Sequence, residues 1–268
     1  MRRYEIALPR GGARERLKIE APWRSSIAAR LERGLAGFEP EGIGCVLALL
    51  ERGARGTFFD VGANIAPYSL VASALTEWKV VAFEPVPDVA KLARHLRDLN
   101  GFAYTIERCA LGEQPGRLPL YISTSSDTSS SLDPDWRPSK GTVEVAVDTL
   151  DAYCERAGAW PAVLKIDTET TEPAVLRGGA RLLAERRPWI VCEVLQGHTE
   201  DALEEIIGPL GYRRYHIRAG GELVEAERLE GRAAEFLDWL LAPEPVDEEL
   251  SKRSRYWTSA LLDCAPGS

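Results

Sequence analysis

Short apolar runs alternate with amphipathic stretches between residues 57 and 109. The runs 57–61 (TFFDV), 80–83 (VVAF) and 103–109 have the length and composition of buried strands. Residues 67–77, which begin with Pro67, and residues 87–99, which carry apolar side chains on one face, are predicted as helices. Strands that alternate with helices through short connections predict a parallel sheet covered by helices on both faces.

The alternation continues through the second half of the chain. Further strands are predicted at 162–167, 189–194, 211–217 and 255–263, and the last is expected to be an antiparallel edge. Helices are predicted at 25–37, 41–52, 173–184, 200–208 and 232–241. The expected fold is therefore α/β, with a mixed seven-stranded sheet and helices on both faces.

Two segments fall outside this rhythm. Residues 1–24 alternate weakly and predict a hairpin that turns at 10–12, and residues 117–147 predict a hairpin-like excursion around a Ser-rich loop, 123–136. The chain shows no internal repeat and no linker. We expect one domain at 41–268, preceded by an N-terminal extension at 1–40.

Composition narrows the range of partners. The 268 residues carry 33 basic and 41 acidic side chains, a net charge of −8, and a nucleic-acid-binding protein would need a cationic face. The five cysteines are widely spaced without a C-x-x-C pair, which argues against a disulfide framework or a zinc site. Neither a signal peptide nor an apolar run of about 18 residues is present, so no membrane association and a cytoplasmic location are expected.

The loop after the first strand of this rhythm indicates the ligand. In an open α/β sheet, ligands bind outside the carboxyl ends of the strands, where the strand order reverses. Here that loop begins at Asp60 and contains Gly62, whereas Asn64 and Pro67 occupy the other two positions of a dinucleotide-binding glycine motif. A carboxylate would repel a pyrophosphate, so Asp60 favours a cationic ligand.

A second acid ends the next strand. Glu84 follows Phe83 and lies 24 positions after Asp60, where a carboxylate accepts hydrogen bonds from ribose hydroxyls. S-adenosylmethionine carries a sulfonium, an amino group and a ribose, so the two acids fit this methyl donor better than a nicotinamide dinucleotide. The competing interpretation is that Asp60 and Glu84 only cap the helices that follow them.

Several segments together resemble the FkbM family of S-adenosylmethionine-dependent methyltransferases. They are FFDVGANIAPYSL, VVAFEPVPDVAKLARHL, CALGE, DTLD and LKIDTETTEPAVLRGGARLL…RPWIVCEV, and the likeness runs from about residue 40 to residue 196. The resemblance implies a class I, Rossmann-like methyltransferase fold. It also implies methylation of a hydroxyl on a sugar or a secondary metabolite, with S-adenosyl-L-methionine as the cofactor.

The resemblance also assigns donor-binding residues. It implies that Asp60, Gly62, Ala63 and Asn64 hold the methionine half, that Glu84 holds the ribose, and that Cys109, Ala110 and Leu111 border the adenine. Tyr68, Ser69, Pro85, Ser130 and Ser131 complete the expected donor site. Two positions depart from the family pattern, because glycine is common where Ala66 and Thr170 stand here. If the second glycine needs a positive φ, a β-branched Thr170 is costly there.

Methyl transfer to an alcohol needs alignment and a base. The candidates for catalysis follow the fourth and fifth strands of this rhythm: Asp167, Glu169 and His198. A carboxylate is an ordinarily weak base for an alcohol, and an imidazole ionises nearer neutral pH, which makes His198 a rival to Asp167. Asp167, Glu193 and a neighbouring acid offer oxygens to a divalent ion, but the spacing does not demand one, and no metal is expected.

The 123–136 loop has two interpretations: a hydrophilic excursion, or a lid that closes Trp136 over the ligands. Two other functions are also left open, a module that binds the donor without turnover and a nicotinamide-dependent oxidoreductase on the same kind of sheet. The expected partner is a small hydroxylated acceptor. A homodimer is left open as the oligomeric state.

Overall fold

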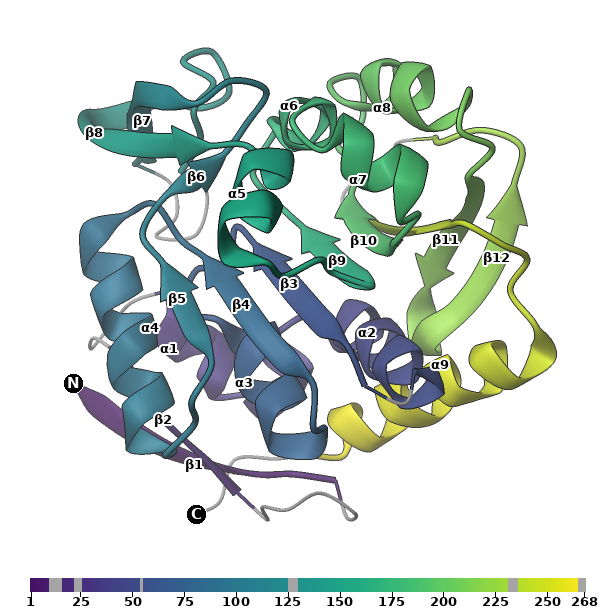
Figure 1. Ribbon diagram of the computed structural model, residues 1–268. Helices are drawn as coiled ribbons and strands as arrows, with labels where there is room; N and C mark the ends of the chain where they lie inside the picture. Colours follow the sequence, from purple (N-terminus) through teal and green to yellow (C-terminus); the bar gives the residue numbers. More distant parts are fainter. Residues whose placement is uncertain (10–15, 22–25, 54, 125–129, 231–235, 265–268) are drawn as a thin grey trace.

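A central sheet of mixed strand direction organises the computed structural model (Figure 1), which describes residues 1–9, 16–21, 26–53, 55–124, 130–230 and 236–264. Within these residues the sheet has eight strands in the order β12-β11-β13-β10-β9-β3-β4-β5. In chain order they are β3 (Thr57–Val61), β4 (Lys79–Phe83), β5 (Thr105–Glu107), β9 (Val163–Ile166), β10 (Trp189–Glu193), β11 (Arg213–Arg218), β12 (Glu222–Ala226) and β13 (Asp238–Ala242).

Strand direction places a ligand crevice at β3. The five strands from β5 to β10 in this order are parallel, and β13 runs antiparallel between β10 and β11. From β3 the chain first builds outward to β4 and β5, and later returns to the other side of β3 with β9 and β10. The carboxyl end of β3 is therefore the point where the strand order reverses.

The predicted α/β fold is confirmed, but the sheet has one strand more than the expected seven. The extra strand, β12, forms a hairpin with β11 across the 3₁₀ turn η2 (Ala219–Gly221), where Gly220 and Gly221 both have positive φ. It lies at the edge of the sheet and no residue in it is fully buried. The sequence ELVEA therefore lacks the apolar run that reveals a buried strand.

Two predictions near the C-terminus are wrong. Residues 255–262 of the predicted strand 255–263 belong to helix α9 (Glu248–Leu262). Of the predicted helix 232–241, residues 238–241 belong to strand β13. Asp247 caps α9 by accepting a hydrogen bond from the Leu250 N–H over 2.8 Å. The helix buries Leu250, Ser254, Thr258 and Leu261, a spacing of three or four residues that the local run RYWTSALL conceals.

Helices cover both faces of the sheet (Figure 1). Alternate residues of β3 face opposite sides, so that Phe58 lies in one core and Phe59 in the other. The core of Phe58 includes α2 (Pro40–Arg52), α3 (Pro67–Leu75), α4 (Pro87–Leu99) and α9. The core of Phe59 includes α5 (Leu150–Ala157), α6 (Glu172–Arg177), α7 (Ala180–Glu185) and α8 (Glu200–Ile207).

The single helix predicted at 173–184 is interrupted between α6 and α7. A side chain on Gly178 would overlap the backbone of Gly112, and one on Gly179 would press on Leu150. This close packing against the start of α5 explains why two glycines stand together there.

The described residues that precede α2 pack on the core of Phe58. Strands β1 (Arg2–Ala7) and β2 (Arg16–Ala21) form the predicted antiparallel pair, although its turn at 10–12 lies outside the described residues. Asn100 at the end of α4 exchanges two hydrogen bonds with the Lys18 backbone, over 2.8 and 2.7 Å. Helix α1 (Ser26–Leu31) and the 3₁₀ turn η1 (Gly34–Gly37) replace the longer helix predicted at 25–37.

A small second sheet stands above the carboxyl ends of β4 and β5 (Figure 1). It contains β6 (Ala110–Leu111), β7 (Gly116–Ser123) and β8 (Ser139–Asp148), and the antiparallel pairing of β7 with β8 confirms the predicted excursion. Across the described part of the chain, no helix combines the length and apolarity that crossing a bilayer would need.

Candidate functional site

A cavity of about 410 Å³ opens at the carboxyl ends of β3, β4, β9 and β10. This size is within the range of small-molecule sites. Of the residues predicted to bind or react, its wall contains Gly62, Ala63, Asn64, Tyr68, Glu84, Pro85, Cys109, Ala110, Ser130, Ser131, Asp167 and Glu169. Asp60, Ser69 and His198 are not part of the wall.

The loop after β3 is held close to two other strand ends. The N–H groups of Gly62 and Ala63 both donate to the Phe83 carbonyl, over 3.1 and 3.0 Å. Gly62 has φ +76°, and a Cβ atom there would overlap the carbonyl oxygen of Asp167. Only glycine meets both demands, so this one residue lets the exit loops of β3 and β9 touch.

Glu84 connects the exit loops of β3 and β4. Its carboxylate accepts hydrogen bonds from the N–H groups of Asn64 (2.9 Å) and Val86 (2.8 Å). The side chain is 6% exposed and lies on the cavity wall. Burial raises the pKa of Glu84 to about 7, against the two N–H donors, which lower it. Each oxygen retains a lone pair that a ligand hydroxyl could use.

Asp60 lies beneath the loop and is fully buried. One of its oxygens accepts hydrogen bonds from the hydroxyl (2.7 Å) and the N–H (3.2 Å) of Ser69, in the first turn of α3. Burial raises the pKa of Asp60, while the nearby Lys165 ammonium and Ser69 lower it. Asp60 and Ser69 therefore fix the helix that carries Tyr68, and neither side chain reaches the cavity surface.

A buried lysine, Lys165, lies close to Asp60 of β3 and to Asp167 after β9. Lys165 is 3% exposed, and its ammonium lies 2.9 Å from Asp167 and 4.8 Å from the centre of the Tyr68 ring. Burial opposes protonation of Lys165, but the carboxylates of Asp167 and Asp60 overcome it and raise its pKa above the ordinary value. Lys165 is therefore a fixed positive charge at the floor of the cavity.

The segment after Asp167 is strained. Glu169 has φ +57° and Thr170 has φ +87°, so a β-branched residue occupies the left-handed region where the family pattern has glycine. Thr170 therefore carries the backbone strain that was expected for a β-branched residue at this position. Neighbouring hydrogen bonds hold the segment: the Ser131 hydroxyl donates to the Glu169 carbonyl over 2.5 Å, and Thr170 donates to Asp133 over 3.2 Å.

Residues 130–137 lie against this segment, while 125–129 of the predicted lid fall outside the described residues. The Trp136 indole N–H donates to the Glu169 carboxylate over 2.9 Å. The exposed His198 ring contacts Trp136 edge-on with centroids 5.0 Å apart. His198 therefore contacts the loop without lining the cavity, whereas Asp167 and Glu169 both line it.

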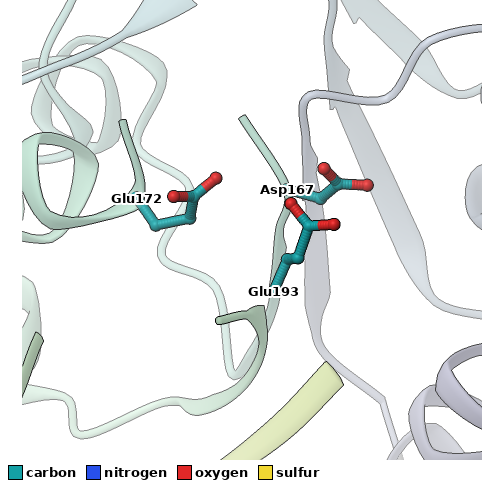
Figure 2. Close-up of side chains that lie close together, drawn as sticks. All are labelled: Asp167, Glu172 and Glu193. Atoms are coloured by element: carbon teal, nitrogen blue, oxygen red, sulfur yellow. The ribbon is translucent and has the colours of Figure 1, made fainter. Parts of the chain in front are cut away.

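Sequence reasoning missed a fully buried acid. Glu172 accepts hydrogen bonds from the N–H (2.7 Å) and the hydroxyl (3.1 Å) of Thr168, and its carboxyl group turns toward Asp167 and Glu193 (Figure 2). Burial raises the pKa of Glu172 to about 7. The third acid of K-I-D-T-E-T-T-E was the available signal.

Two more acids reach the cavity region without a sequence signal. The Tyr68 hydroxyl lies 3.4 Å from both Glu39 and Asp238, which come from the chain ahead of α2 and from the start of β13. Burial raises the pKa of Asp238 to about 7. Only the assembled sheet brings positions so far apart in the chain to the same tyrosine.

Comparison with known proteins identifies a family for the segment that contains these exit loops. A family model described as the methyltransferase FkbM domain matches residues 60–233. A search of curated protein sequences gave no match.

Solved structures give distant likenesses. One is methyltransferase FkbM from Methylobacillus flagellatus KT, with 16% identity and a TM-score of 0.45, over 69% of this chain and 43% of that chain. A second is a SAM-dependent O-methyltransferase from Thermotoga maritima, with 14% identity and a TM-score of 0.40, over 76% of this chain and 66% of that chain. A third is a precorrin-6y C5,15-methyltransferase from Geobacter metallireducens GS-15, with 14% identity and a TM-score of 0.40, over 74% and 84%. The chain thus spans less than half of the Methylobacillus protein.

Proposed function

The chain belongs to the FkbM methyltransferase family, and we propose that it transfers the methyl group of S-adenosylmethionine to a hydroxyl of a small sugar or secondary-metabolite acceptor. The observation that carries the proposal is the family match over residues 60–233, because this segment supplies most of the cavity wall, including both exit loops and Glu84.

The electrostatics of the cavity support a cationic, ribose-bearing donor. Glu84 offers lone pairs to two ribose hydroxyls, and Asp60 adds a carboxyl group beneath the loop that would hold the methionine half. The 62–64 loop is held by hydrogen bonds to the Phe83 carbonyl and by close packing of Gly62 on the Asp167 carbonyl, both of which exist without a ligand. Such preorganisation reduces the ordering cost of binding.

The chain's own groups can supply the acceptor chemistry. Asp167 lies on the cavity wall and is held in place by the Lys165 ammonium over 2.9 Å. In the proposed reaction Asp167 accepts the proton of the acceptor hydroxyl as the oxygen attacks the methyl carbon in line with the departing sulfur. His198 lies off the wall, which favours Asp167 over it as the base.

Titration calorimetry with S-adenosylmethionine and, separately, with NAD tests the donor. We expect binding of the first and none of the second; the reverse result would favour an oxidoreductase. A panel of sugars and polyhydroxylated small molecules, assayed for S-adenosylhomocysteine, tests turnover. Donor binding with no product across amine, thiol and hydroxyl acceptors would instead favour a module that binds without reacting.

A further inference from the structure

The strongest unexplained feature is a cluster of three carboxylates at the edge of the cavity. Asp167 follows β9, Glu193 ends β10 and Glu172 begins α6, and one carboxyl oxygen of each lies within 4.8 Å of the others (Figure 2). Three negative groups at this distance repel one another unless something neutralises them.

Two of these carboxylates have unused oxygens. Glu172 is fully buried, and neither its Oε2 nor the buried Oε2 of Glu193 has a hydrogen-bond partner among the described residues. An unpaired buried carboxylate oxygen is costly, typically by a few kcal/mol. Lys165 relieves only Asp167, with which it forms its ion pair.

Shared protons explain the arrangement less well than a cation does. A carboxyl group that donates to a carboxylate brings their oxygens to about 2.5–2.7 Å, and neither unused oxygen makes such a bond. An ion that binds oxygen at about 2.0–2.6 Å holds opposite ligands about 4–5 Å apart. The three carboxyl oxygens lie within 4.8 Å of one another, so all three can reach one such ion.

We propose that Asp167, Glu172 and Glu193 bind one divalent cation of the oxygen-preferring kind, such as Mg²⁺ or Mn²⁺. This differs from the expectation, drawn from the sequence, that no metal is present. Asp167 and Glu193 belong to the cavity wall whereas Glu172 lies behind them. The ion is therefore anchored from the protein side and open toward the cavity.

The proposed ion also has a consequence for the choice of acceptor, which rests on the proposed function. An ion open to the cavity can take an acceptor hydroxyl as a ligand and lower its pKa, so that Asp167 or water removes the proton more easily. Acceptors with two neighbouring hydroxyls would then be preferred, because both oxygens can bind the same ion.

Binding is tested on the whole chain after treatment with EDTA and dialysis, without donor or acceptor. Calorimetric titration with MnCl₂, checked by electron paramagnetic resonance of free Mn²⁺, is expected to show saturable binding of one ion per chain and an increase in melting temperature. Glu193→Gln and Glu172→Gln are each expected to weaken binding at least about tenfold, because affinity follows the number of charged ligands. Glu185→Gln, an exposed acid on α7, is the matched control and is expected to bind like the wild type.

Circular dichroism establishes that each variant is folded. If a buried substitution prevents folding, Asp167→Asn, whose side chain is 25% exposed, provides the same test at the open edge of the cluster. Wild-type protein that shows no saturable binding at millimolar Mn²⁺ and Mg²⁺, or folded variants that bind as tightly as the control, would overturn the proposal. Because the experiment measures ion binding and not methyl transfer, a chain that binds the donor but no ion contradicts only this inference, and one that binds Mn²⁺ but not the donor contradicts only the proposed function.

Discussion

The α-carbon of Gly62 faces the carbonyl oxygen of Asp167 so closely that no side chain fits between them. This contact joins the exit loops of β3 and β9, the neighbouring parallel strands between which the strand order reverses. Because Gly62 also has φ +76°, Gly62→Ala is expected to lower the free energy of unfolding by at least about 3 kcal/mol, the sum of the left-handed backbone cost and the overlap. Urea denaturation measures the loss.

Gly211 provides the matched control. It has φ +67°, and a Cβ atom there would meet nothing within 4 Å. Gly211→Ala therefore tests the backbone cost alone and is expected to lose only about 1–2 kcal/mol. Equal losses in the two variants would mean that the close approach to Asp167 is not what requires glycine at position 62.

Glu84→Gln is expected to weaken S-adenosylmethionine binding about 10- to 100-fold, which corresponds to the loss of hydrogen bonds to a charged acceptor. An amide has only one oxygen, so it cannot serve both the Asn64 and the Val86 N–H groups and two ribose hydroxyls. Calorimetry measures the donor affinity, and Glu113→Gln, an exposed acid after β6, is the control. Donor affinity unchanged in Glu84→Gln would remove Glu84 from the donor site.

The same carboxyl group makes stability depend on pH. Its pKa is about 7 in the folded chain and near 4.5 in the unfolded chain, so the folded state retains the proton longer. Protonated Glu84 therefore stabilises the folded state. Its contribution to the free energy of unfolding is complete below pH 4.5 and is lost as the pH rises from there to about 7, by up to about 3 kcal/mol. Glu172 and Asp238 act in the same direction.

Denaturant unfolding at pH 5, 6 and 7, with EDTA present, measures this decline. Wild-type stability is expected to fall across the series, and Glu84→Gln, which has no proton to lose, is expected to fall less. Parallel curves for the two proteins would show that Glu84 does not titrate in this window.

A comparison of turnover decides whether Asp167 or His198 is the general base. Asp167→Asn is expected to lower kcat at least about 100-fold, the usual contribution of a general base, with a smaller effect on donor affinity. His198→Ala is expected to change kcat by less than about threefold, because its ring contacts Trp136 and does not line the cavity. Full activity in Asp167→Asn would exclude it as the base, and a large loss in His198→Ala alone would restore the rival.

The sequence predicted the part of the site that depends on local pattern. β4 and β9 are short, mostly apolar strands that are each followed by an acid, so the pattern of residues alone was enough to place Glu84 and Asp167 at one edge of the sheet. Asp60 shows the limit of that reasoning. It lies within β3, and its side chain points under the exit loop toward Ser69 and not into the cavity.

The rest depended on contacts between distant parts of the chain. Asp238 meets Tyr68 only because β13 inserts between β10 and β11. The misassigned C-terminus has the same cause. DWLLA is a strand and RYWTSALL a helix because of the elements they pack against, namely β10 for the first and α2 for the second. Local propensity is a weak guide where tertiary contacts compete with it.

The contact between Trp136 and Glu169 tests the lid interpretation within the described residues. Trp136→Phe keeps the ring and removes the indole N–H that donates to Glu169 over 2.9 Å. Loss of about 1–2 kcal/mol of local stability is expected to speed amide hydrogen exchange in residues 130–137 by about tenfold, with little change in the melting temperature. Mass spectrometry of exchanged peptides measures the rates. Trp160→Phe, at a half-buried tryptophan outside the cavity wall, is the control. Exchange that is equally slow in both variants would mean that the backbone pairing of Tyr121 with Ser131 holds the loop without the indole.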